Sequence, residues 1–199
     1  MPLNSPQIQH TVLNNQLELA ILNLNEFAAH FKLTDKRTIE KQAALYAVKT
    51  ILKDDNLEIL YNESGKPYLH NLKISISHSY DWLTVLFSFN GVDIGVDIEK
   101  VRDKILNIKE KFLSLQELQD LKNASVEKYI TYWAVKEAVY KAIGKIGLIF
   151  EEHIHVEDFT YSQKGGKIIT HVQHPDIEKN YTLHYQLLNE YILVYTDNQ

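Results

Sequence analysis

The sequence contains no cysteine, and this absence excludes several kinds of chemistry at once. Without thiols the chain can form no disulfide, no thiolate metal site and no cysteine nucleophile. Any metal site must therefore use oxygen or imidazole ligands. The chain also lacks an apolar run approaching the roughly 20 residues that span a bilayer, and its Asn- and Gln-containing N-terminus lacks the layout of a secretion signal. We therefore expect a cytoplasmic protein with no membrane partner.

Positive charge is also in short supply, because 21 Lys and Arg residues face 26 Asp and Glu residues, for a formal net charge of −5. Nucleic-acid binding generally requires a net positive footprint or a large basic stripe, so we expect no nucleic-acid partner. An anionic ligand would need a local basic pocket. With 199 residues, of which 45% are hydrophobic, the chain can bury a substantial core in one large domain or two small ones.

The predicted secondary structure has a similar order in both halves of the chain: a strand, then helix, then several strands. The first half has a strand at 17–22, a helix at 35–52 with Thr34 as N-cap, and strands at 57–61, 73–77 and 83–89. The second half has a strand at 92–99, helices at 114–122 and 126–143, and strands at 154–159, 167–172, 181–188 and 191–196. Two similar α+β lobes, 1–94 and 95–199, are the simplest architecture. No low-complexity linker separates them, so we expect a ligand cleft along their seam.

The run at 95–100 places two carboxylates on one face of the fourth predicted strand after the first helix. Side chains of a strand alternate, so Val96 and Ile98 point one way while Asp97 and Glu99 point the other. Like charges this close repel each other unless solvent or a cation lies between them. A divalent cation held by oxygen ligands would suit the pair, and Glu137 on the helix at 126–143 can supply a third ligand.

Each of these carboxylates also has a simpler interpretation. The strand pair can be the solvated face of an edge strand, with Lys100 and Lys104 as nearby counter-charges. Asp93 is a competing carboxylate on the same predicted face. Glu137 and Lys141 have the favourable spacing of an ordinary helical surface pair. The spacing alone leaves these alternatives open.

Three further segments carry groups suited to binding phosphate. The run at 75–79 ends a predicted strand with three hydroxyls and one imidazole, and the turn at 65–68 projects Lys66. Arg37 and Lys41 lie one helical turn apart, a like-charge spacing that a bound anion would relieve. Neutralisation of both by Glu40 is the alternative. A Ser-His neighbour pair is weak support for a nucleophile, because a catalytic triad needs spatial adjacency and an orienting acid.

Five segments in this order resemble the 4′-phosphopantetheinyl transferases. They are GKPY at 65–68, ISHS at 76–79, GVDIEK at 95–100, FLSLQE at 112–117 and WAVKEAVYK at 133–141. Within that family, the sequence resembles the single-chain, two-lobed, surfactin-synthetase-activating type. The resemblance implies two pseudo-symmetric α+β lobes, each with a mainly antiparallel sheet and a long helix. It further implies that coenzyme A is bound between them, with Mg2+ at its pyrophosphate.

The resemblance also implies roles for individual residues of the second lobe. Asp97, Glu99 and Glu137 would be the metal ligands. Lys136 and Lys141 would contact the pyrophosphate and stabilise its charge. Attack by the acceptor hydroxyl would also need a base, for which Glu137, directly or through a metal-bound water, is the candidate.

In the first lobe, the resemblance implies that Lys66, Ser77 and His78 bind the phosphates of coenzyme A, with His78 at the 3′-phosphate. Arg37 and Lys41 would grip the nucleotide.

The implied reaction moves phosphopantetheine from coenzyme A to a serine of an apo acyl or peptidyl carrier protein, catalysed by a monomer. The candidates for carrier docking come from the region 105–125, with ordinary helix packing as the alternative: Phe112, Leu115, Leu118 and Lys122. A metal-dependent phosphoesterase or nuclease is a rival function, because clustered carboxylates also serve phosphodiester hydrolysis. A non-catalytic coenzyme A or carrier-protein binding module is a second rival. Such a module would be expected to have lost a carboxylate or Lys136, and none is missing.

Overall fold

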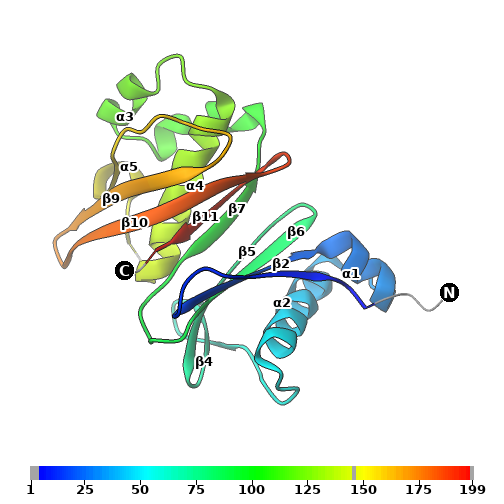
Figure 1. The fold of residues 1–199 in the computed structure, drawn as a ribbon. Helices are drawn as coiled ribbons and strands as arrows, with labels where there is room; N and C mark the ends of the chain where they lie inside the picture. Colours follow the sequence, from blue (N-terminus) through cyan, green and yellow to red (C-terminus); the bar gives the residue numbers. More distant parts are fainter. Residues whose placement is uncertain (1–4, 145–146, 198–199) are drawn as a thin grey trace. The chain divides into compact units, whose positions relative to one another are not determined.

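Two antiparallel sheets, each accompanied by a long helix, make up the regular structure of the computed structural model (Figure 1). The structure describes residues 5–144 and 147–197. It divides the chain into two units, Met1–Asp93 and Ile94–Gln199. The predicted α+β class with antiparallel sheets is confirmed. The lobes proposed from the sequence, 1–94 and 95–199, also contain residues 1–4, 145–146 and 198–199, which lie outside the described residues.

The first unit is a six-stranded sheet with strand order β1-β2-β6-β5-β4-β3 and two helices. Its strands are β1 Ile8–Val12, β2 Leu17–Asn23, β3 Leu60–Tyr61, β4 Pro67–Leu69, β5 Leu72–Ser79 and β6 Trp82–Ser88; its helices are α1 Leu24–Phe31 and α2 Lys36–Leu52. Helix α2 packs against β2 and β6 through buried small side chains such as Ala43 and Ala47. The predicted N-cap, Thr34, was wrong by one residue, because the carboxylate of Asp35 accepts a hydrogen bond from the Thr38 amide at 2.8 Å.

The second unit is a five-stranded sheet with strand order β7-β11-β10-β9-β8. Its strands are β7 Val96–Lys100, β8 Ile154–Val156, β9 Gly166–His174, β10 Ile177–Leu188 and β11 Tyr191–Thr196. Its helices are α3 Leu115–Asp120, α4 Val126–Ile143 and α5 Phe150–His153, with short 3-10 helices η1 Asp103–Asn107 and η2 Lys109–Lys111. Helix α4 packs on β7 and β11 and ends at Gly144, which adopts a left-handed conformation. In the described part of the chain, no helix has the length and apolar character to cross a membrane.

Candidate functional site

Strand β7 can approach helix α4 closely because a glycine precedes it. A Cβ atom on Gly95 would lie 1.7 Å from the carbonyl oxygen of Ala138, so no other residue fits without moving the helix. The backbone of Gly95 also donates to Oγ1 of Thr196 at 3.0 Å and accepts from the Thr196 amide at 2.9 Å. These contacts fix the start of β7 against both α4 and the end of β11.

The two carboxylates of β7 project toward the helix-covered face of the sheet. Asp97 lies opposite Val194 and Glu99 opposite Ile192 in the ladder with β11. Residues directly opposite in an antiparallel pair share a face, and both partners belong to the hydrophobic core that contains α4. The predicted placement of Asp97 and Glu99 on one face is therefore confirmed. That face is turned to α4, and Asp97 is buried.

Helix α4 meets these carboxylates with one stripe of side chains. Trp133, Glu137 and Lys141 succeed one another by one helical turn and so share a face. Lys141 Nζ donates to Oδ1 of Asp97 at 2.6 Å, and Trp133 Nε1 donates to Oε1 of Glu99 at 2.9 Å. The role of Trp133 was missed from the sequence, where this residue appeared only within the motif at 133–141. Its spacing of one turn from Glu137 was the signal that could have revealed it.

Glu137 lies in the electrostatic field of both strand carboxylates. The pKa of Glu137 is raised to about 7, first by burial and then by the negative charge of Asp97, against the opposing effect of Lys141 and with a smaller contribution from Glu99. Glu137 therefore lies close enough to both strand carboxylates to be repelled by them. A carboxyl group with this pKa exchanges a proton near neutral pH.

The donor atoms of this cluster suit a hard divalent cation. All three side chains offer carboxylate oxygens, the ligands that Mg2+ prefers. The raised pKa of Glu137 results first from burial and then from the negative charge of Asp97, and a cation would offset that charge. Within residues 5–144 and 147–197, however, no group of three or more His, Asp or Glu side chains is already arranged to hold a metal ion. The ammonium group of Lys141 lies against Asp97 instead. The donor types fit magnesium, but the carboxylates would have to reorient to coordinate it.

Lys136 lies away from this cluster and is fully buried. Its Nζ donates to Oε2 of Glu117 at 2.7 Å and to the carbonyl oxygen of Phe150 at 3.1 Å. Glu117 also accepts from the amides of Ser114 at 2.7 Å and Val156 at 3.0 Å. Burial lowers the pKa of Lys136, while the Glu117 carboxylate opposes that shift. The predicted contact of Lys136 with pyrophosphate is not supported by this position, which instead ties α4 to α3 and β8.

The first unit brings together three of the predicted nucleotide ligands. Arg37, Lys41 and His78 line one cavity of about 300 Å³, together with Glu40 and Tyr61. Nδ1 of His78 lies 3.3 Å from Oε1 of Glu40. The cavity therefore combines two permanent cations, an imidazole and an aromatic ring, which are groups suited to a nucleotide phosphate and its base. Glu40 and Tyr61 were not identified as lining residues from the sequence.

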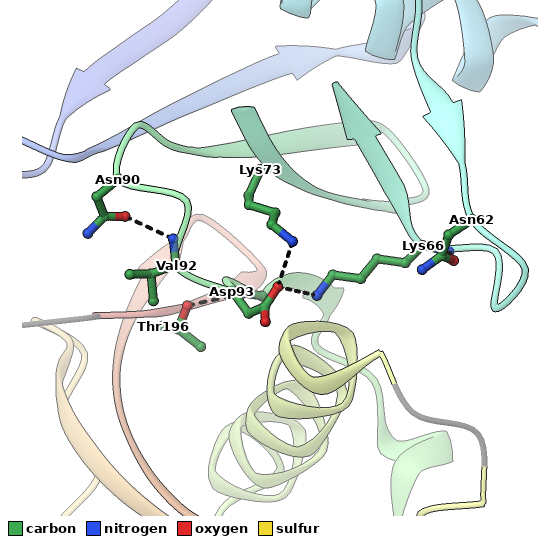
Figure 2. A network of polar contacts seen from close by, with 8 residues as sticks. Asn62, Lys66, Lys73, Asn90, Val92, Asp93 and Thr196 are labelled. Atoms are coloured by element: carbon green, nitrogen blue, oxygen red, sulfur yellow. Dashed lines mark hydrogen bonds and ion pairs between the residues drawn. The ribbon is translucent and has the colours of Figure 1, made fainter. Parts of the chain in front are cut away.

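Lys66 and Ser77 lie elsewhere in the same unit. Lys66 lines a second cavity, of about 460 Å³, and Figure 2 shows its ammonium group beside Asp93, at 3.3 Å from Oδ1. Asp93 therefore interacts with a lysine, and it precedes β7. Ser77 is buried, whereas the next residue, His78, is exposed. Successive residues of a strand point to opposite faces, so the hydroxyl of Ser77 does not face the cavity lined by His78.

Comparison with known proteins agrees with the geometry of the second unit. The family model described as the 4′-phosphopantetheinyl transferase superfamily matches residues 93–196, just over half of the chain. The chain belongs to this superfamily. The matched region contains all three clustered carboxylates and Lys141. The cationic cavity of the first unit lies outside it.

Curated relatives carry the same family name. The chain is 32% identical to 4′-phosphopantetheinyl transferase gsp of Aneurinibacillus migulanus over 99 residues, 47% of this chain and 41% of the relative. It is 35% identical to psf-1 of Bacillus pumilus over 89 residues, 41% and 37% of the two chains. It is 33% identical to Sfp of Bacillus subtilis (strain 168) over 101 residues, 47% and 44%. The chain thus covers less than half the length of each of these 4′-phosphopantetheinyl transferases.

The residues predicted to contact a carrier protein differ in exposure. Phe112 is fully buried and packs edge-to-face against Trp133, with ring centroids 5.2 Å apart, so the packing alternative holds for it. Leu118 is partly buried against the core of the second unit. Leu115, in contrast, is 81% exposed in the first turn of α3, and Lys122 is exposed just beyond this helix. Only Leu115 and Lys122 of the four are well placed to contact another protein.

Proposed function

We propose that this chain transfers 4′-phosphopantetheine from coenzyme A to a serine of an acyl or peptidyl carrier protein. The observation that carries the proposal is the cluster of Asp97, Glu99, Glu137 and Lys141 on β7 and α4, inside the region matched by the family model. A cluster of carboxylates with one ammonium group suits chemistry at a pyrophosphate held through a divalent cation. We further propose that the enzyme is cytoplasmic and works as a monomer.

Asp97, Glu99 and Glu137 are the proposed ligands of Mg2+. When bound, the ion supplies positive charge that neutralises the pyrophosphate of coenzyme A. Trp133 keeps the carboxylate of Glu99 oriented through its 2.9 Å hydrogen bond. Lys141 donates a hydrogen bond to Asp97 at 2.6 Å. If the Lys141 side chain moved from Asp97 to a phosphate oxygen, the Asp97 carboxylate would become available to the metal ion and the ammonium charge would stabilise the leaving group.

The proposed reaction is an attack of the carrier serine on the β-phosphorus of coenzyme A. A carboxylate oxygen of Glu137 takes the hydroxyl proton, which the pKa of about 7 allows at neutral pH. The serine oxygen forms a bond to phosphorus as the bond to the bridging oxygen breaks. Phosphopantetheine is then esterified to the serine, and adenosine 3′,5′-bisphosphate leaves as a stable anion.

In the first unit, the cavity of about 300 Å³ is the proposed site for the nucleotide part of coenzyme A. Arg37 and Lys41 supply permanent positive charge, and His78 remains the proposed ligand of the 3′-phosphate. Lys66 is retained as a phosphate ligand that must exchange its present partner, Asp93. Ser77 stays a prediction, which its burial on the opposite strand face does not favour.

The test is incubation with coenzyme A, magnesium and an apo carrier protein, followed by mass measurement of the carrier. A gain of one phosphopantetheine group is expected for the wild type. We expect Glu137→Gln to lose turnover while it still binds coenzyme A at least in part. Glu152→Gln removes an exposed carboxylate of α5 and should retain turnover.

The rival functions give different results in the same assay. A metal-dependent phosphoesterase or nuclease would cleave phosphodiesters and leave every carrier unmodified. A binding module would retain coenzyme A without any change in the mass of the carrier. Full activity of Glu137→Gln would remove Glu137 from the mechanism.

A further inference from the structure

Asp93 is held by two lysines of the first unit. Its Oδ1 lies 3.3 Å from Nζ of Lys66 and 3.4 Å from Nζ of Lys73 (Figure 2). Burial by itself raises the pKa of Asp93, but the charges and hydrogen bonds of Lys66 and Lys73 outweigh it and leave the pKa below its ordinary value. Asp93 is therefore an anion at neutral pH.

The backbone around Lys66 is fixed by a tight turn. Oδ1 of Asn62 accepts from the amides of Ser64 at 3.0 Å and Lys66 at 2.8 Å, and the Asn62 amide donates to the Lys66 carbonyl at 3.1 Å. Gly65 provides the positive φ of 76° that the turn requires. The side chain of Lys66 is only 16% exposed. Its ammonium group is therefore presented from a fixed base rather than from a mobile loop.

The other two members of this group are accessible to a ligand. The side chains of Asp93 and Lys73 are 47% and 45% exposed, and Lys66 and Lys73 both line the cavity of about 460 Å³. A ligand phosphate that enters this cavity can reach both ammonium groups if the carboxylate moves aside. The pyrophosphate of coenzyme A carries one negative charge on each phosphorus, two in all, whereas the carboxylate carries one, so the exchange favours the pyrophosphate.

We propose that Asp93 is an affinity-determining residue, an internal anion that occupies Lys66 and Lys73 until a phosphate of coenzyme A takes its place. This inference rests on the proposed function only in that Lys66 is taken as a phosphate ligand. Asp93 lowers the affinity for every ligand at this position, and it does so most for ligands whose charge is too small to displace it. Ligands that bring a single negative charge to this position are thereby disfavoured relative to coenzyme A.

The experiment is calorimetric titration of coenzyme A into the full chain at low salt, with magnesium present. Asp93→Asn keeps the shape of the side chain and removes its charge. The dissociation constant of the variant should be about fivefold lower than that of the wild type, which is the ratio that ~1 kcal/mol from a partly exposed ion pair produces. Asp93→Ser should show the same gain and serves as the second variant if the first folds poorly.

A matched control and a double variant separate ion-pair exchange from general electrostatics. Asp55→Asn removes an exposed aspartate of the same unit and should change the dissociation constant less than twofold. In a Lys66→Ala background, the gain from Asp93→Asn should be smaller than in the wild type, because one of the two cations that the carboxylate occupied is gone and only Lys73 remains.

Each other outcome has a definite meaning. Unchanged or weaker binding of both Asp93 variants would overturn the inference, as would an undiminished gain in the Lys66→Ala background or an equal gain from Asp55→Asn. If the wild type does not bind coenzyme A at all, the proposed function is overturned as well. Binding by the wild type with no response at Asp93 would overturn this inference alone.

Discussion

Replacement of Glu137 by Gln should stabilise the metal-free protein at neutral and alkaline pH. The pKa of Glu137 is raised from an ordinary 4.5 to about 7, so between these values the folded state binds more protons than the unfolded state. Stability from this group is therefore present at low pH and is lost as the pH rises toward 7. A shift of this size corresponds to a penalty of ~3 kcal/mol once the folded-state carboxyl is ionised.

Glutamine has nearly the same shape and carries no charge at any pH. The free energy of unfolding of Glu137→Gln minus that of the wild type should therefore increase by roughly 2.5 kcal/mol between pH 5 and pH 8. Urea unfolding in the presence of EDTA measures this difference. Trp82 lies in the first unit and Trp133 in the second, so a Trp82→Phe background lets the fluorescence of Trp133 report the second unit.

Magnesium should reverse the sign of this difference in the free energy of unfolding between Glu137→Gln and the wild type. At pH 8 the ion should stabilise the wild type and have a smaller effect on Glu137→Gln, because a ligand that binds only the folded state raises its stability. For the Glu152→Gln control, the difference in the free energy of unfolding from the wild type should stay constant across the same pH range. A difference between Glu137→Gln and the wild type that does not change between pH 5 and pH 8 would refute the placement of Glu137 beside Asp97 and Glu99.

Two further substitutions test other parts of the second unit. Lys136→Met removes one partner of the buried pair with Glu117, so the free energy of unfolding measured in urea should fall by ~3 kcal/mol. The dissociation constant of the folded variant for coenzyme A should stay unchanged. Weakened coenzyme A binding with full stability would instead support the predicted pyrophosphate contact. Leu115→Glu adds charge to an exposed apolar side chain and should raise KM for the carrier protein at least fivefold, ~1 kcal/mol, without affecting coenzyme A binding. Equal KM values for this variant and the wild type would place carrier docking elsewhere.

Much of the second unit could be predicted because its signals are local. The alternation of Asp97 with Val96 and Ile98 predicts a shared carboxylate face from the strand period alone. The helix predicted at 114–122 is present as α3, and its start is marked by a local signal, the capping box formed by Ser114 and Glu117. What the sequence could not provide was the pairing of elements. The contact of Gly95 with the backbone of Ala138 joins residues far apart in the chain, and no local sequence pattern predicts it.

Two site predictions weakened because neighbours in sequence were treated as neighbours in space. Ser77 and His78 are adjacent in the chain, yet the strand places them on opposite faces. Lys136 and Glu137 are also adjacent, but one residue of helix turns the side chain by about 100°, so Glu137 faces β7 while Lys136 enters the core. The same periodicities that identified the elements could have separated these residues.

The hydrogen bonds to Glu117 have a consequence for how α3 meets another protein. A helix this short is marginal by itself, yet its N-terminal turn is anchored to the protein interior by a carboxylate that joins α4 and β8. The exposed Leu115 next to that anchor is consequently held in place before any partner arrives. Association at this surface would cost little conformational entropy. A single small apolar contact can then contribute more to the binding free energy than it would on a mobile loop.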